Sequence, residues 1–210
     1  MAASGEAMGG VKVAFLEAIA AVVPVALVYF SGWAYLSSYV GVFGIDATQL
    51  DVGFPTVLVY AFRPLQSWAL LLFAAVVVGL AALVYKFGIR RQLFWWSYIV
   101  VILVSALFVI SYVAKDSANE MAENVWRGKK VQAFANVSSG GPSADEYKLC
   151  QQDFRLYQII GLANRLFLLC RSALTPCDRG VMYVINDDGR ITYTANEIRR
   201  DVNGRQICTD

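Results

Sequence analysis

Three apolar stretches constrain the fold of the first half of this chain, because each is long enough to cross a bilayer as a helix. They run over residues 11–39, 65–85 and 93–113. About 20 apolar residues in helical form span the hydrocarbon core. The first stretch is too long for a cleaved signal peptide, so we expect a retained helix. The second could begin earlier and bend at Pro64. We therefore predict a membrane anchor of three transmembrane helices in residues 1–115.

Composition divides the chain into two parts. Of the 210 residues, 58% are hydrophobic and 16% are charged. The mean hydropathy of +0.51 is too high for an ordinary soluble domain. Residues 116–210 nevertheless have the mixture typical of a small globular domain. A net charge of +2 gives no sign of a nucleic-acid partner. Histidine is absent, and it is the commonest metal ligand and a frequent general base. We therefore expect neither an enzyme nor a metal or other cofactor.

Basic residues beside the apolar stretches predict the orientation of the anchor. Lys86, Arg90 and Arg91 form a turn between the second and third stretches, and Lys12 begins the first. The opposite side offers only Arg63. Because basic residues in short loops remain cytoplasmic, the N-terminus is expected inside and the C-terminal part in the periplasm, across a bacterial inner membrane. The second and third stretches lack ionisable residues at mid-bilayer depth, which ion pathways usually need. This observation disfavours a transporter, but three helices could still oligomerise around a pore, so a subunit of an oligomeric channel or transporter is the alternative function.

The connection after the first stretch, residues 40–55, is more apolar than a linker requires. Asp46 is suited to cap a short helix, with Gln49 completing a weak capping box. We expect the segment either to lie on the bilayer surface or to dock against the C-terminal domain or an outside partner. Its candidate interface residues are Phe43, Ile45, Asp46, Leu50, Asp51 and Phe54. A membrane enzyme that uses Asp46 and Asp51 as its carboxylates is a further alternative.

Part of this region resembles a known group of proteins. Residues 32–36 (GWAYL), 39–46 (YVGVFGID) and 50–52 (LDV) are similar to poorly characterised bacterial three-span inner-membrane proteins with a small periplasmic domain. In that group, an aromatic-rich helix end is followed by Phe-Gly-Ile-Asp. The resemblance covers residues 30–60 and the general architecture, and it implies no biochemical activity. In layout alone, the chain is also similar to membrane-resident immunity proteins against pore-forming bacterial toxins.

The C-terminal part is expected to be a small β-rich domain. The third helix should continue into residues 116–130 and end at Arg127-Gly128. The Asn-Asp-Asp-Gly sequence at 186–189 is a strong hairpin signal. A helix over residues 152–172 is the alternative to the hairpin expected there. A sheet or open barrel of four to six strands is predicted, with strands near 130–137, 155–161, 166–171, 180–185 and 190–194.

All four cysteines, Cys150, Cys170, Cys177 and Cys208, lie in this C-terminal part. An even number of cysteines in a small extracytoplasmic domain predicts disulfides. Of three possible pairings, we favour Cys170–Cys177 together with Cys150–Cys208. A zinc site is disfavoured because no two cysteines have the C-x-x-C spacing, and free thiols are the remaining alternative. The cysteines thus support the same orientation as the basic turn.

These observations predict the class of the protein. We expect a membrane α+β protein in which three transmembrane helices are followed by a small β-rich, disulfide-stapled extracytoplasmic domain. Its function is expected to be non-enzymatic, with the periplasmic domain binding a protein partner and the anchor contacting membrane lipid. Toxin immunity and anchoring of an envelope complex are the two expected forms of that function.

Overall fold

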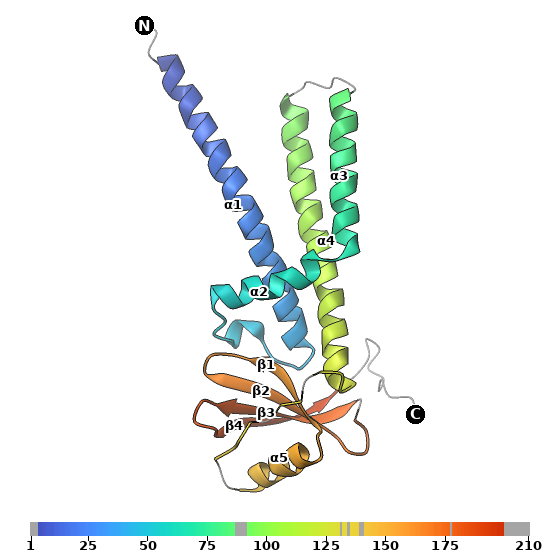
Figure 1. The fold of residues 1–210 in the computed structure, drawn as a ribbon. Coiled ribbons are helices and arrows are strands. Elements are labelled where there is room, and N and C mark those ends of the chain that lie inside the picture. The colour runs from blue at the N-terminus through green and yellow to red at the C-terminus, as the bar shows by residue number, and fades with distance from the viewer. Residues whose placement is uncertain are drawn as a thin grey trace. The chain divides into compact units, whose positions relative to one another are not determined.

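The computed structural model describes residues 4–86, 92–130, 132–133, 135–138, 141–176 and 178–199. The chain forms two compact units, whose secondary structure is drawn in Figure 1. The helical unit comprises residues 1–36 and 53–117, and the sheet unit comprises residues 37–52 and 118–210. The sheet unit is therefore assembled from two stretches that are far apart in the sequence.

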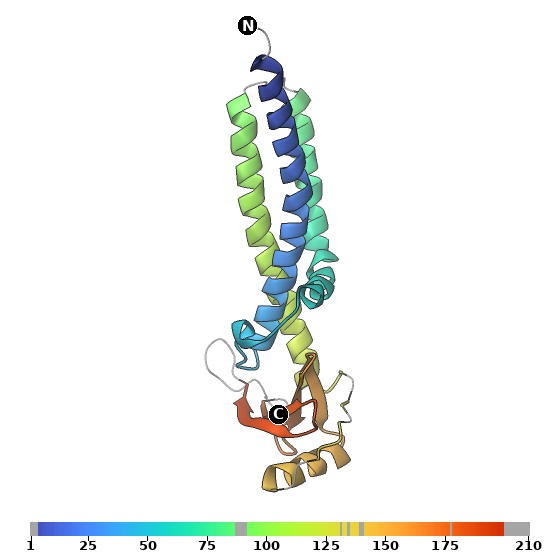
Figure 2. The ribbon, with the colours of Figure 1, turned by 90° about the vertical axis from the view of Figure 1, so that its left-hand side faces the viewer.

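Long apolar helices account for the first half of the chain. They are α1 (Ser4–Gly41), α2 (Phe54–Leu65), α3 (Trp68–Lys86) and α4 (Gln92–Trp126). α1 is one continuous helix although it contains Pro24 (Figure 2). α2 begins after Gly53, with Pro55 in its first turn, where proline costs no hydrogen bond.

Two segments of the described helices are long and apolar enough to cross a membrane, Ala21–Gly41 and Ser97–Trp126. A third candidate is the pair formed by α2 and α3, which is bent by 76° at its break. The break lies at Gln66 and Ser67, two residues after Pro64, close to the bend that the sequence predicts. The chain is thus a membrane protein with two candidate spans, or three if the bent pair is one span.

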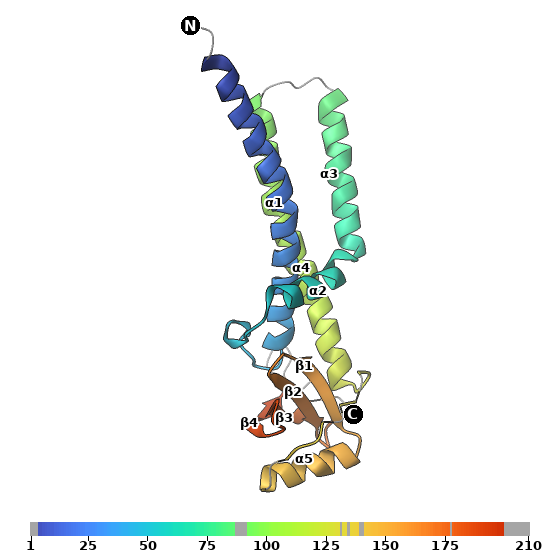
Figure 3. The same cartoon turned by 60° about the vertical axis from the view of Figure 1, so that its left-hand side comes forward.

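Close contacts join the helices of the helical unit. α2 crosses α1 at Gly32, which lies against the backbone of Val57 (Figure 3). Two pairs of stacked rings flank this crossing, Tyr29 with Phe54 at 5.3 Å between centroids and Tyr35 with Tyr60 at 5.9 Å. The hydroxyl of Tyr98 on α4 donates to the carbonyl of Val77 on α3 at 3.1 Å.

An antiparallel sheet of four strands forms the centre of the sheet unit. The strands are β1 (Leu156–Gly161), β2 (Arg165–Arg171), β3 (Arg179–Asn186) and β4 (Ile191–Ile198), and neighbours in sequence are neighbours in the sheet. Both predicted hairpins are present, so the alternative helix over 152–172 is wrong. Gly189, in the turn between β3 and β4, has a φ of +74°, which glycine adopts without steric cost.

One face of the sheet packs against α5 (Pro142–Gln152). The buried core on this face consists of Tyr147, Cys150, Leu156, Leu168, Cys170, Tyr183 and Ile185. A disulfide between Cys150 and Cys170 attaches α5 to β2. The favoured pairings Cys170–Cys177 and Cys150–Cys208 are therefore wrong. α5 has no counterpart in the sequence prediction, and it brings the Cα atom of Cys150 to 6.0 Å from that of Cys170. Cys177 and Cys208 lie outside the described residues.

The segment before α5 also differs from the prediction. Residues 130–137 were expected to form a strand, but their described part contains only an isolated bridge between Gln132 and Tyr157. Ala133, Ala135 and Val137 instead pack on the core beside α5. The hydroxyl of Tyr147 donates to the carbonyl of Ala135 at 2.7 Å and so holds the segment across the sheet face. Its apolar residues are thus used for packing rather than for strand pairing.

Candidate functional site

Residues 37–52 lie against the second face of the sheet, the face opposite α5. Tyr39 and Phe43 are almost completely buried in the sheet unit, and the ring of Phe43 stacks on that of Trp126 at 6.2 Å. The hydroxyl of Tyr39 donates to the carbonyl of Ile159 in β1 at 2.8 Å. Of the alternatives considered for residues 40–55, the structure therefore has the stretch up to Val52 docked in the C-terminal domain.

Asp46 fixes the turn at the centre of this stretch. Its carboxylate accepts hydrogen bonds from the backbone N–H of Thr48 at 2.9 Å and from the Thr48 hydroxyl at 2.8 Å. The carboxylate caps a short 3-10 helix, Ala47–Gln49. The two bonds lower the pKa of Asp46, so it stays ionised at neutral pH. Gly44 enters the turn with a φ of +67°.

A groove of about 530 Å³, which we name the turn-side groove, lies between this turn and the second sheet face. Its floor includes the apolar side chains of Phe167, Met182 and Val184, which alternate with the core residues of β2 and β3. Charged groups also line it, Asp46 and Glu197 being acidic and Arg165 basic. Partial burial raises the pKa of Glu197, because the charged form is poorly solvated there.

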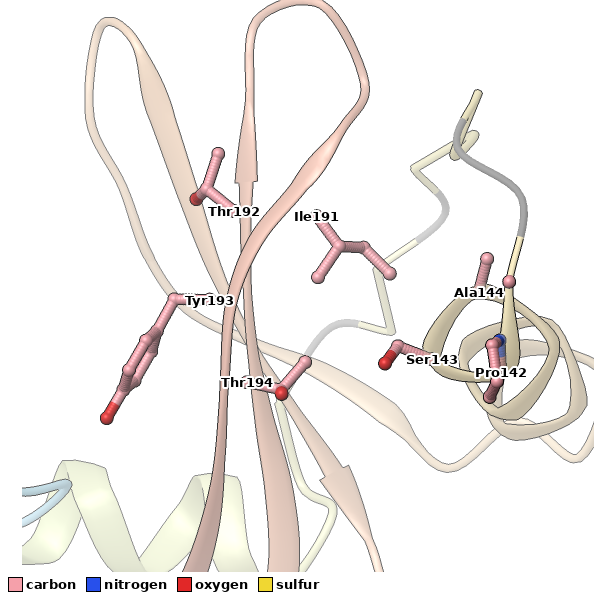
Figure 4. A pocket seen from close by; sticks show the side chains of 8 residues that line it. Pro142, Ser143, Ala144, Ile191, Thr192, Tyr193 and Thr194 are labelled. Carbon is pink, nitrogen blue, oxygen red and sulfur yellow. The ribbon is translucent and has the colours of Figure 1, made fainter.

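A second groove of about 410 Å³ lies on the α5 side of the sheet, and we name it the α5-side groove. It is lined by residues 141–144, at the start of α5, and by residues 191–194 of β4. Figure 4 shows Ile191 and Ser143 pointing into the space between strand and helix, whereas Tyr193 points to the other side of the strand. Residues of β4 therefore line a groove on each face of the sheet.

The outer edge of β4 is open in the part of the chain that the structure describes, where β4 pairs with β3 alone. The N–H of Arg199 donates to the carbonyl of Asp178 at 2.7 Å, so these two residues form a hydrogen-bonded pair at the end of the β3–β4 pairing. Hydrogen-bonded and non-hydrogen-bonded pairs alternate in antiparallel strands. Counting from that bond, the backbone N–H and C=O groups of Thr194 and Asn196 point away from β3.

The opposite edge of the sheet, at β1, is partly covered. A bulge at Ile159 interrupts the β1–β2 register, and its carbonyl is already bonded to Tyr39. Gln132 bridges to Tyr157, and the N–H of Ala133 donates to the carbonyl of Leu156 at 3.1 Å. Bulges and covering segments are common means of blocking edge strands. The two edges thus differ, because β1 is partly covered whereas no backbone partner lies along the outer side of β4 in the described structure.

The structure separates the predicted interface residues. Ile45, Asp46 and Leu50 line the turn-side groove, and Phe43 is buried beneath the turn. Phe54 belongs to the helical unit, where it stacks on Tyr29. Asp51 lines a different, smaller pocket of about 190 Å³, so the two carboxylates Asp46 and Asp51 share no pocket in the described structure.

The structure describes only one of the three basic residues that predict the membrane orientation. Lys86 is exposed at the end of α3, whereas Arg90 and Arg91 lie outside the described residues. The residues that sequence reasoning missed are those of β4: Tyr193, Thr194, Asn196 and Glu197. Alternation predicted a strand over the first half of this segment, but no local signal marks a strand as the open edge of a sheet.

Comparison with known proteins adds no relative. No family model, no curated protein and no solved structure matches this chain.

Proposed function

We propose that this chain is a non-catalytic, membrane-anchored binding protein that holds an extended segment of a partner protein by strand addition to β4. The observation that carries the proposal is the eight-residue edge of β4, open in the described structure and bordered by a groove on each face. Added strands gain affinity from backbone hydrogen bonds and specificity from pockets for alternate side chains. β4 offers both, an open backbone edge for hydrogen bonds and grooves for alternate side chains.

We propose that the sheet unit lies outside the cytoplasm, across a bacterial inner membrane. The basic residues at Lys86, Arg90 and Arg91 support this orientation. The Cys150–Cys170 disulfide supports it independently, because such bonds persist in oxidising compartments. A partner there is a periplasmic segment of an envelope protein or a toxin, so anchoring and immunity are the two biological forms of the proposal.

The assembly of the sheet unit from two separate stretches of the chain also supports three crossings of the membrane. Residues 37–52 and 118–210 form one compact unit, which supports placing both stretches on the same side of the membrane. Residues 53–117 must then cross it an even number of times. Counting the bent pair of α2 and α3 as one crossing and α4 as the return satisfies that condition, and α1 places the N-terminus opposite. A reporter fused after Asp210 should be active only if its enzyme works in the periplasm, and cytoplasmic activity would contradict this orientation.

The decisive experiment removes the outward backbone donor of β4 without disturbing the sheet. Thr194→Pro deletes an N–H that points away from β3, and proline is tolerated at such edge positions. Thr194→Val keeps the N–H and is the matched control. Ten-residue random peptides are selected by display on the full chain in lipid nanodiscs, and the dissociation constants of the selected peptides are measured for each variant.

We expect Thr194→Pro to weaken binding about 10- to 100-fold, since it removes a hydrogen bond and places a ring where the incoming strand must lie. Thr194→Val should bind within about twofold of the original protein. The helix and sheet content of both variants is checked by circular dichroism. Unchanged binding by a folded Thr194→Pro variant would refute strand addition at this edge.

A further inference from the structure

The side chains of β4 that face the turn-side groove define what an added strand must carry. Tyr193, Ala195 and Glu197 lie opposite Val184, Met182 and Gly180 of β3, so they share the second sheet face. Each of these residues directs its own backbone groups toward β3. In antiparallel addition, such residues form non-hydrogen-bonded pairs with the incoming strand, in which side chains approach most closely.

Glu197 is the charged member of this row. Its carboxylate is partly buried, and no ion pair or hydrogen bond to it is recorded within the described ranges. At Gly44 of the turn, an added Cβ atom would lie 4.0 Å from each carboxylate oxygen of Glu197. Asp46 of the same turn adds a second negative charge to the groove.

Arg165, the basic residue of this groove, lies at its other end. It pairs with Asn186 at the end of β3, whereas Glu197 pairs with Gly180 near the start of β3. Six residues of strand separate these positions, which corresponds to roughly 20 Å. Arg165 is also two strands away from the open edge. Arg165 is therefore distant from Glu197 within the turn-side groove, although Glu197 also borders a separate pocket lined by Arg155, Arg171 and Arg179.

We infer that the partner segment carries a lysine or arginine opposite Glu197 and a large apolar residue opposite Ala195. The inference rests on the proposed strand addition. A cationic side chain there pairs with a carboxylate that lacks a partner of its own in the described structure. The small side chain of Ala195 leaves room over the apolar floor formed by Met182 and Phe167. The partner class is thus an extended segment with alternating basic and apolar residues.

A second copy of this chain fits the edge less well. Its β4 would bring the short side chains of Thr194 and Asn196 to the α5 side, and Glu197 itself to the turn-side groove. Ile191–Ile198 of that copy contain no cation for Glu197, although Arg199 follows directly after them. Pairing of two β4 edges is nevertheless a distinct outcome of the experiment below.

The experiment compares two seven-residue fluorescent peptides, Thr-Lys-Thr-Leu-Thr-Tyr-Thr and the same peptide with Glu in place of Lys. Fluorescence anisotropy is measured with the full chain in lipid nanodiscs and with the variants Glu197→Gln, Glu197→Lys and Thr194→Pro. We expect the original protein to prefer the Lys peptide about three- to tenfold, because cross-strand charge pairs favour opposite signs and disfavour like signs. Glu197→Gln should abolish the preference, and Glu197→Lys should reverse it.

The outcomes separate the two proposals. Equal binding of both peptides, still lost in Thr194→Pro, would overturn the charge inference and leave strand addition in place. Binding that Thr194→Pro does not change would overturn both. If neither peptide binds, the charge inference is overturned, and the display-selected peptides decide strand addition separately. A dimer seen by sedimentation that Thr194→Pro dissociates, without peptide binding, would identify a second copy as the occupant and overturn the inference.

Discussion

Whether replacing Gly32 by alanine stabilises or destabilises the protein depends on one contact. Replacing glycine by alanine in the interior of a helix ordinarily stabilises it by about 0.5–1 kcal/mol, because the unfolded chain loses freedom. At Gly79 in α3, an added Cβ atom meets nothing within 4 Å. Gly79→Ala is therefore expected to show this ordinary gain, and it is the matched control.

At Gly32 the added Cβ atom would overlap the carbonyl oxygen of Val57 and lie 2.9 Å from the carbonyl carbon, where ordinary contacts are 3.4–4 Å. Both atoms are backbone, so only a shift of α2 against α1 can relieve the overlap. Overpacking of this kind costs about 1–3 kcal/mol. After subtraction of the helical gain, we expect Gly32→Ala to lose up to about 2.5 kcal/mol of unfolding free energy.

The measurement is unfolding of the full chain in mixed detergent micelles with increasing sodium dodecyl sulfate, followed by helical circular dichroism. Gly79→Ala should shift the midpoint upward and Gly32→Ala downward. Adding Val57→Ala to Gly32→Ala should restore little, because the overlapping atoms belong to the backbone. If Gly32→Ala is as stable as Gly79→Ala, α1 and α2 do not cross at this position and the reasoning fails.

Three further predictions concern the sheet unit. Replacing Cys150 and Cys170 together by alanine should lower the free energy of unfolding by about 3 kcal/mol, since the disulfide closes a loop of about 20 residues. Pulse proteolysis measures this loss. A peptide map that links Cys150 to another cysteine would contradict the pairing. Tyr39→Phe leaves the carbonyl of Ile159 unpaired, so it should lower the free energy of unfolding by about 1–3 kcal/mol and speed amide exchange in β1. Tyr193→Phe on the exposed strand is the control, and it should change the free energy of unfolding by less than about 0.5 kcal/mol. Because burial raises the pKa of Glu197, affinity for the Lys peptide should be full above that pKa and fall as the pH drops through it. The pKa of Asp46, the other carboxylate of the groove, is lowered by its bonds to Thr48, so Asp46 is not expected to cause this change. The same loss of affinity in Glu197→Gln would assign the pH dependence to another group.

Local sequence signals found the parts of the fold that local interactions determine. The turn at residues 186–189 contains Asp-Gly, and the strands on either side alternate, so this hairpin could be predicted. The end of α4 was predicted for a similar reason. Gly128 has a φ of +69°, and the N–H groups of Gly128 and Lys129 donate to the carbonyls of Val125 and Asn124, which is a Schellman cap.

The parts that were missed depend on distant packing. α5 follows a run of serine and glycine and is mostly polar, and only Ala144, Tyr147 and Cys150 show its buried side. Missing that helix also led to the wrong disulfide, since the helix is what brings Cys150 to β2. Strand order is likewise a tertiary property, so sequence alone cannot reveal that β4 is an open edge while β1 is partly covered.

The excess of apolar residues after the first apolar stretch was visible in the sequence, but their target was not. Phe43 and Leu50 are apolar enough to require burial, and either lipid or protein could have provided it. The structure resolves the choice because Phe43 stacks on Trp126, which is 83 positions later in the chain. A contact across such a distance leaves no periodic signal.

The division of the sheet unit into two stretches also determines when it can form during synthesis. Residues 37–52 emerge first and must wait, with Phe43 and Leu50 uncovered, while residues 53–117 are made and inserted. Only then does the chain supply Trp126 and the strands that cover them. The sheet unit can therefore form only late in synthesis, after the apolar stretch between its two parts has been made.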